Sequence, residues 1–263
     1  FMQPLRKVIS KLKLRASYGQ VGNANLGGRR FAYLSTITDD YETLNMYKWG
    51  LDSSYGLTGM AEGEFAVQDL TWEIVNKMNL GVELGFLNGM IDLQLDYFDE
   101  RRKDIFMPRE SVPMTAGFMK QPWKNFGKVT NQGVEVSLNV NKQFGKDLFV
   151  SLMGTFTYAH NEITEKDEPS AVVGTNRAET GHPVGQLTGY IAEGLFTADD
   201  FEDVSTGKLK EGIPTQSFVG KLRPGDIRYR DVNGDGKVDV FDKSPIGGTK
   251  DPEIVYGLSL IHI

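Results

Sequence analysis

The sequence of 263 residues contains no cysteine. Disulfide bonds, thiol catalysis and thiolate metal sites are therefore excluded. No apolar run reaches the roughly 18 residues that a membrane-spanning helix requires. The chain starts Phe1-Met2-Gln3-Pro4, which has no signal-peptide pattern, and it stops inside an expected strand at its other end. These features lead us to expect a fragment of a longer exported protein.

Signals of catalysis and of nucleic-acid binding are also missing. The three histidines, His160, His182 and His262, are scattered, and no nucleophile elbow, zincin or phosphate-binding glycine motif occurs. The formal net charge is −6, and residues 160–252 hold 17 acidic and 11 basic residues, so all of the excess lies in that segment. Because no basic cluster is present, a nucleic-acid partner is not expected. We also expect that the protein is not an enzyme.

What the sequence does contain is a series of strands with alternating apolar and polar residues. Residues 76–159 read as four such strands, in two hairpins. The first hairpin turns at Leu87-Asn88-Gly89, whose Asn-Gly pair suits a tight turn, and the second at Phe144-Gly145-Lys146. A further strand is expected before them over residues 12–18, and another after them near Glu253. The apolar faces of the hairpins include Leu80, Val82, Leu93, Leu95, Val136 and Leu138.

The connections between these strands alternate in length. The expected strands are about ten residues long, enough to cross a bilayer at a tilt. Two turns are very short, whereas residues 21–75, 101–131 and 160–252 form long loops. Outer-membrane barrels have short periplasmic turns and long extracellular loops. The sequence therefore predicts an all-β fold: part of a transmembrane antiparallel β-barrel, with about six strands present and long extracellular loops.

The polar face of these strands carries charged residues in mid-strand, which a water-filled lumen accepts and an apolar core does not. We expect seven residues to face the lumen: Glu83, Asp92, Gln94, Asp96, Glu135, Asn139 and Asn141.

The alternative is a soluble, calcium-dependent β-sandwich that acts as a binding module or surface adhesin. Period-2 strands with one polar face also build such sandwiches. The apolar face separates the two interpretations. A barrel leaves Leu80, Val82, Leu93 and Leu95 on a continuous band facing lipid, whereas a sandwich buries them under a second sheet.

One sharp motif lies in the last long loop. Residues 231–242 match the calcium-loop pattern, with Gly236 allowing the sharp turn and Val238 expected to point inward. A hard cation requires six to eight oxygen ligands, so the chain must wrap around it. An alternative is an Asp-, Asn- and Gly-rich turn without a cation. The candidate ligands of a structural Ca²⁺ are Asp231, Asn233, Asp235, Lys237 (through its carbonyl), Asp239 and Asp242.

Several segments together resemble the SusC/RagA family of TonB-dependent outer-membrane transporters of Bacteroidetes. They include Leu14-Arg15-Ala16-Ser17-Tyr18-Gly19, Leu70-Thr71-Trp72-Glu73, Asn125-Phe126-Gly127, Gly181-His182-Pro183 and the calcium-like loop preceded by Pro224-Gly225-Asp226. The resemblance runs through nearly the whole chain, so residues 1–263 are interpreted as part of such a barrel, with 160–252 as its long extracellular loop.

The resemblance implies a 22-strand barrel with an internal plug, located in the cell outer membrane of a Bacteroidetes-like bacterium. It further implies contact with outer-membrane lipids, a SusD-like lipoprotein as partner, and TonB as energy source through parts absent from this sequence. An oligosaccharide, other glycan or peptide would be the imported nutrient. The segments that resemble the family are all of the barrel, and none resembles the plug.

Overall fold

A computed structural model describes residues 8–38, 47–49, 55–57, 60–118 and 120–263. The chain forms two compact units. Unit 1 comprises Phe1–Pro169 with Glu253–Ile263, and unit 2 comprises Ser170–Pro252. Among the described residues, no helix is both long and apolar enough to cross a membrane.

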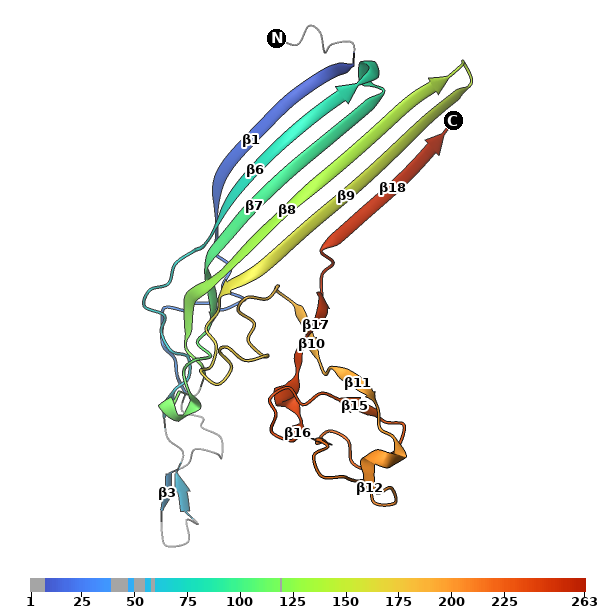
Figure 1. Ribbon diagram of the computed structural model, residues 1–263. Helices are drawn as coiled ribbons and strands as arrows, with labels where there is room; N and C mark the ends of the chain where they lie inside the picture. Colours follow the sequence, from blue (N-terminus) through green and yellow to red (C-terminus); the bar gives the residue numbers. More distant parts are fainter. Residues whose placement is uncertain (1–7, 39–46, 50–54, 58–59, 119) are drawn as a thin grey trace. The chain divides into compact units, whose positions relative to one another are not determined.

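Unit 1 is built on one antiparallel sheet of six long strands, as Figure 1 shows. The spatial order β1-β6-β7-β8-β9-β18 follows the chain order, so each long strand pairs with the long strand before it. The strands are β1 (Ile9–Asn23), β6 (Glu73–Phe86), β7 (Ile91–Pro108), β8 (Trp123–Phe144), β9 (Leu148–Glu165) and β18 (Ile254–His262). The all-β prediction and the expected number of strands are confirmed.

The register brings apolar residues of all six strands into common rows across the sheet. One row joins Leu14, Val82, Leu95, Val136, Phe156 and Tyr256. The next row joins Leu12, Leu84, Leu93, Leu138, Gly154 and Leu258. Since successive residues of a strand point to opposite faces, these rows form one apolar face.

Apart from β18, which has nine residues, the strands of this sheet are longer than the expected ten. β8 has 22 residues and β7 has 18, and their pairing continues to Pro108 and Trp123. The connection between them is consequently shorter than predicted, because it runs only over residues 109–122. Backbone pairing does not require the apolar alternation that marks a bilayer-crossing segment, so the sequence pattern ends before the strands do.

The connections are of two kinds, as predicted. β6 and β7 are joined by the short helix η1 (Leu87–Gly89), where Leu87, Asn88 and Gly89 all have positive φ. The β1–β6 connection carries two small antiparallel strand pairs, one of which lies between the two strands of the other in the sequence, and the β7–β8 connection carries one short helix. Their elements are β2 (Ile37–Thr38), β3 (Tyr47–Trp49), β4 (Tyr55–Leu57), β5 (Ala61–Glu62) and η2 (Met114–Ala116).

Unit 2 lies within the predicted long loop and has its own small core. Phe196, Phe201 and Leu222 are buried, and Leu209 and Ile213 pack against them. Its strands pair as β10-β17, β11-β15, β12-β13 and β14-β16. The elements are β10 (Gln186–Gly189), β11 (Ala192–Leu195), η3 (Ala198–Asp200), β12 (Phe201–Asp203), β13 (Lys208–Leu209), β14 (Thr215–Gln216), β15 (Ile227–Tyr229), β16 (Lys237–Val238), η4 (Val240–Asp242) and β17 (Ser244–Thr249).

Candidate functional site

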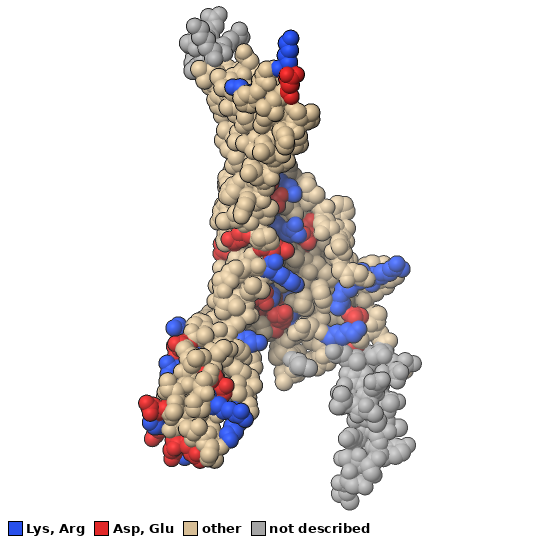
Figure 2. Space-filling view, turned by 90° about the vertical axis from the view of Figure 1, so that its right-hand side faces the viewer, with Lys and Arg blue, Asp and Glu red and all other residues tan. Residues whose placement is uncertain are grey.

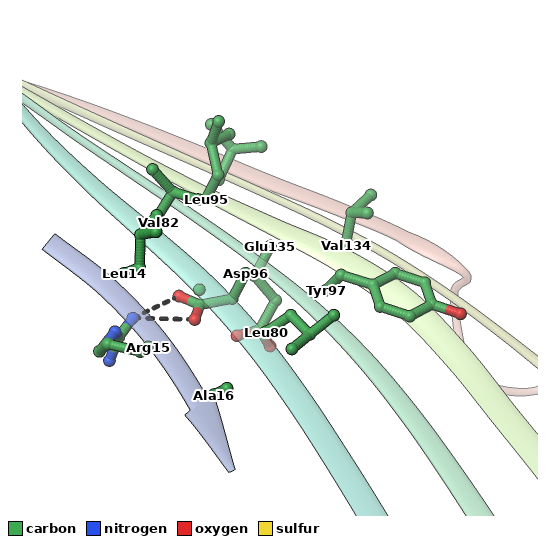
Figure 3. A pocket seen from close by; sticks show the side chains of 12 residues that line it. Leu14, Arg15, Ala16, Leu80, Val82, Leu95, Asp96, Tyr97, Val134 and Glu135 are labelled. Atoms are coloured by element: carbon green, nitrogen blue, oxygen red, sulfur yellow. Dashed lines mark hydrogen bonds and ion pairs between the residues drawn. The ribbon is translucent and has the colours of Figure 1, made fainter. Parts of the chain in front are cut away.

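The polar face of the sheet carries an ion pair that spans three strands. Nη2 of Arg15, on β1, donates to both carboxylate oxygens of Asp96, on β7, at 2.8 Å each. Strand β6 lies between them, and Gly81 is its residue in this row. Figure 3 shows the guanidinium and the carboxylate facing each other. The absence of a side chain at Gly81 leaves the room in which they meet.

A second carboxylate on this face is surrounded by cations. The Glu83 carboxylate forms ion pairs with three residues of β1: its oxygens lie 2.8 Å from Lys11 Nζ, 3.2 Å from Lys13 Nζ and 3.3 Å from Arg15 Nε. In the space-filling view, Lys, Arg, Asp and Glu side chains of unit 1 lie intermixed along the sheet (Figure 2). Such a wall is polar but nearly balanced in charge.

All seven predicted lumen residues lie on this polar face. The register places Gln94 and Asp96 beside Ser137 and Glu135, and Asp92 beside Asn139. Gln94 Nε2 donates to Asp96 Oδ2 at 2.8 Å, and Asn141 accepts from Ser151 Oγ at 2.7 Å. Glu83 and Glu135 complete the set. That this face lines a lumen remains a prediction.

The basic residues of the polar face were not among the residues predicted to face the lumen. Lys11, Lys13 and Arg15 alternate with Leu12 and Leu14 in the strand that was expected there. The same alternation that identified the acidic residues would have placed these three on the polar face.

The opposite face is apolar and exposed. Leu80, Leu95 and Leu14 are 46%, 38% and 74% exposed. Several of these side chains, shown in Figure 3, line a shallow hollow of about 660 Å³. Within unit 1, no second sheet of the described residues covers this face, which goes against the β-sandwich alternative. The six predicted band residues Leu80, Val82, Leu93, Leu95, Val136 and Leu138 share this face.

A single antiparallel sheet with one exposed apolar face and one charged face defines a segment of a transmembrane β-barrel wall. Comparison with known proteins agrees with this class. Residues 5–247 match the family described as TonB dependent receptor-like, beta-barrel. The chain belongs to this family.

Two relatives show how much of such a protein the chain represents. TonB-dependent receptor SusC of Bacteroides thetaiotaomicron is 29% identical over 250 residues, which cover 90% of this chain and 22% of SusC. TonB-dependent receptor P39 of Formosa agariphila is 26% identical over 275 residues, covering 95% of this chain and 25% of that protein. The chain therefore spans about a quarter of the length of the relatives it matches.

Solved structures show the same fold. The structure of the RagAB peptide transporter aligns with a TM-score of 0.65 at 22% identity, covering 98% of this chain and 25% of that one. The RagAB peptide importer in its closed-closed state aligns with a TM-score of 0.64 at 22% identity, with 97% and 25% covered. The resemblance to the SusC/RagA family is confirmed.

The calcium-like loop of unit 2 is wrapped by its own side chains. Asp231 accepts from the backbone N–H groups of Gly234 and Gly236, at 2.6 and 2.7 Å. Asp235 accepts from Lys237 N–H at 2.9 Å, and Asn233 accepts from Asp235 N–H at 2.9 Å. The chain thus turns tightly at the residues that would supply the first ligands.

The end of this loop is buried. Asp242 and Val238 are fully buried, as expected for Val238. Asp242 accepts from the backbone N–H groups of Val232, Asn233 and Asp239. Burial raises the pKa of the nearby Tyr190, and the negative charges of Asp239 and Asp242 raise it further.

The loop offers the oxygen donors that a hard cation prefers, but these donors do not converge on one point. Among the described residues, no three Asp, Glu, His or Cys side chains converge as a metal site requires. Calcium binding would therefore have to draw Asp231, Asp235 and Asp239 together. The calcium site stays a prediction.

Proposed function

We propose that this chain forms part of the wall of an outer-membrane TonB-dependent transporter that imports a nutrient. The observation that carries the proposal is the two-faced sheet, because one exposed apolar face and one charged face suit a wall between lipid and an aqueous lumen. Membership of the TonB-dependent receptor family supports it. Outer-membrane lipids would contact the apolar face.

The nutrient is proposed to be an oligosaccharide, other glycan or peptide, captured together with a SusD-like lipoprotein. The RagAB structures, which are those of a peptide importer, support the peptide class. The oligosaccharide class and the lipoprotein partner rest on the resemblance to the SusC/RagA family. Energy would come from TonB. Catalysis is not part of the proposal, because the matched relatives are named as receptors.

Gene deletion tests the function directly. The bacterium lacking the intact protein should lose import of labelled peptides or of labelled oligosaccharides, and the wild-type gene should restore it. Deleting TonB should abolish the same import. Unchanged import of both substrate classes after deletion would overturn the proposal. Co-purification of a lipoprotein with the wild-type protein would test the partner.

We also propose that residues 231–242 bind a structural Ca²⁺. The donor set and the buried Asp242 and Val238 support this, since a loop anchored at its end can close around a cation. Asp231, Asn233, Asp235, Asp239, Asp242 and the Lys237 carbonyl would hold the ion. Its role would be to order unit 2, with no part in transport chemistry.

A further inference from the structure

A cavity in unit 1 lies where two long connections meet the start of β8, and we refer to it as the β8 cavity. Its volume is about 320 Å³. A cavity of this size has room for a small ligand such as one sugar ring or one amino-acid residue. The lining comes from three chain segments: residues 65–69 of the β1–β6 connection, Arg109 and Val112 of the β7–β8 connection, and residues 122–124.

The three segments are fixed to one another by hydrogen bonds. The Arg109 N–H donates to the Pro122 carbonyl at 2.8 Å. The side chain of Asn125, on β8, binds both backbone groups of Thr71: its Oδ1 accepts from the N–H and its Nδ2 donates to the carbonyl, at 3.0 Å each. These bonds hold the first segment against β8 just beyond the cavity. A lining that is already ordered lowers the entropic cost of binding a ligand.

One part of the lining is apolar and aromatic. It includes Phe65, Val112 and Trp123. The Trp123 ring is held in place by the Arg29 guanidinium, 4.3 Å from its centroid, and by the Phe106 ring, whose centroid lies 5.1 Å away. Phe65 is 40% exposed, so a ligand can reach its ring. Aromatic rings offer a large apolar surface, and the C–H groups on one face of a sugar ring supply the matching surface.

The other part of the lining is polar, and three of its side chains have no partner. Gln68, Asp69 and Lys124 line the cavity and are exposed. In the part of the chain that the structure describes, none of the three forms a hydrogen bond or an ion pair. Asp69 and Lys124 have opposite charges and line the same cavity, yet they do not pair with each other. A ligand can therefore bind both of them at once.

The charges of the lining cancel, which favours a neutral ligand. Asp69 balances Lys124, and Arg109 is engaged by Asp167, whose Oδ2 lies 3.0 Å from its Nε. A hydroxyl group both donates and accepts hydrogen bonds. Neighbouring hydroxyl groups of a sugar can therefore donate to the Asp69 carboxylate and accept from the Lys124 ammonium group.

A peptide backbone fits this lining less well than a sugar. Bound peptides commonly pair with the free backbone N–H and C=O groups of a strand edge. In the β8 cavity such groups are already in use. The Val67 N–H donates to the Ala32 carbonyl at 2.9 Å, and the Val112 N–H donates to the Arg109 carbonyl at 3.2 Å. The Arg109 N–H and the Pro122 carbonyl bind each other, so side chains supply the groups that a ligand would meet.

We propose that the β8 cavity binds one neutral sugar unit of an oligosaccharide. Phe65 and Trp123 contact the apolar face of the sugar ring. Gln68, Asp69 and Lys124 bind its hydroxyl groups. The proposal rests on the proposed import function, and it selects neutral sugars from the nutrient classes proposed there.

Isothermal titration of the intact protein tests the proposal. The detergent is lauryldimethylamine oxide, because a detergent with a sugar headgroup would compete for the site. The probes are maltotriose, cellotriose, mannotriose and xylotriose, with tri-alanine as the peptide probe. At least one trisaccharide should bind, and tri-alanine should not. Failure of all four trisaccharides to bind overturns the proposal, as does binding of tri-alanine that is lost on replacement of Asp69 or Lys124.

Variants place the binding in the cavity. Asp69→Ala and Lys124→Ala should each weaken trisaccharide binding by about tenfold, because each removes a hydrogen bond to a charged group. Both residues are exposed and without partners, so the variants should fold normally. Asp147→Ala and Lys103→Ala are the matched controls, since they remove exposed charges of unit 1 that do not line the cavity. Equal affinities of all four variants would overturn the assignment.

The titration and an import measurement fail independently of each other. Sugar binding that depends on Asp69 and Lys124, in a bacterium whose import does not require the protein, would overturn the transport proposal and leave this site standing. Import that requires the protein, without sugar binding at the β8 cavity, would overturn this site and leave the transport proposal standing.

Discussion

Arg15 and Asp96 form an ion pair although a whole strand separates them. The pair crosses β6 above Gly81, and Asp96 is only 8% exposed. A Cβ atom at Gly81 would lie 2.3 Å from Asp96 Oδ1 and 3.0 Å from Arg15 Nε. The ion pair therefore requires glycine at position 81.

We predict that Gly81→Ala destabilises the protein by separating this pair. The new methyl group must displace the Asp96 carboxylate, which then loses its guanidinium partner in a mostly buried position. The expected loss in free energy of unfolding is about 1–3 kcal/mol, the cost of leaving a buried polar group without its partner. Urea unfolding of the protein in lipid vesicles measures it.

The control for this change is Gly19→Ala. Gly19 lies on β1 and on the same face as Arg15, but a Cβ atom there would meet nothing within 4 Å. It should leave stability nearly unchanged. In an Asp96→Ala background, the cost of Gly81→Ala should also largely disappear. An equal loss at both glycines, or no coupling to Asp96, would contradict the explanation.

The second prediction compares two neighbouring residues on opposite faces of β7. Leu95→Lys places a charge on the apolar face and should destabilise the protein in vesicles by about 2–4 kcal/mol, as charges facing lipid do. Gln94→Lys places the same charge on the face that carries Glu83 and Asp96, so its effect should be much smaller. Comparable unfolding curves for the two variants would contradict the assignment of the faces.

Spin labels at the same positions give an independent measurement. A label at Leu95 should be accessible to lipid-soluble oxygen, whereas a label at Gln94 should be accessible to a water-soluble relaxation agent. Lipid accessibility at Gln94 would exclude the lumen assignment for the polar residues.

The sequence predicts the sheet well because alternation is a local property. The faces of Leu93, Leu95 and Asp96 follow from the alternation within their own strand, so no partner strand has to be known. The Arg15–Asp96 pair could not be predicted, because it requires the register of β1 against the β6–β7 hairpin, from which a long connection separates it in the sequence. The strand ends at Pro108 and Trp123 were missed because pairing there continues without an apolar face.

Unit 2 was harder to predict for a different reason. Its strands have only two to six residues, which is too short to show a period, so the core residues Phe196, Phe201 and Leu222 could not be identified by alternation. The calcium-like loop was visible because its ligand spacing is fixed by the chain itself.

The third prediction concerns pH and the β7–β8 connection. Asp167 is buried, and burial raises its pKa, but the Ser111 N–H and hydroxyl and the Arg109 guanidinium outweigh this and lower the pKa below its usual value. A carboxyl group whose folded pKa is lowered stabilises the fold above its unfolded pKa, near 3.9. That stabilisation is lost as the pH falls through the folded pKa.

Hydrogen exchange of the Ser111 amide measures this locally. Its protection should be high at pH 7 and should fall below about pH 4, in step with protonation of Asp167. Asp167→Asn should have lower protection at pH 7 and should show little further change on acidification. A wild-type protection that does not depend on pH in this range would contradict the prediction, once the intrinsic exchange rate is corrected for.

The fourth prediction tests the calcium loop without unfolding it. Asp235→Asn removes one negative charge but retains a side-chain oxygen that can accept from Lys237 N–H, so the turn is preserved. Calcium titration of the wild-type protein should show binding with a Kd of about 10⁻⁴–10⁻³ M, the range of extracellular modules. Asp235→Asn should weaken it by about tenfold, since a charged ligand is replaced by a neutral one.

Asp199→Asn is the matched control, because it removes one acidic charge from the same unit outside the loop. Its calcium affinity should equal that of the wild type. Asp242→Asn is less informative, since Asp242 accepts three backbone N–H groups and its replacement disturbs the loop itself. No binding at millimolar calcium, or equal weakening by Asp199→Asn and Asp235→Asn, would show that residues 231–242 form a self-satisfied turn. If calcium binding is weakened in Asp235→Asn but not in Asp199→Asn, the loop binds calcium, and its carboxylates must come together when the ion is bound.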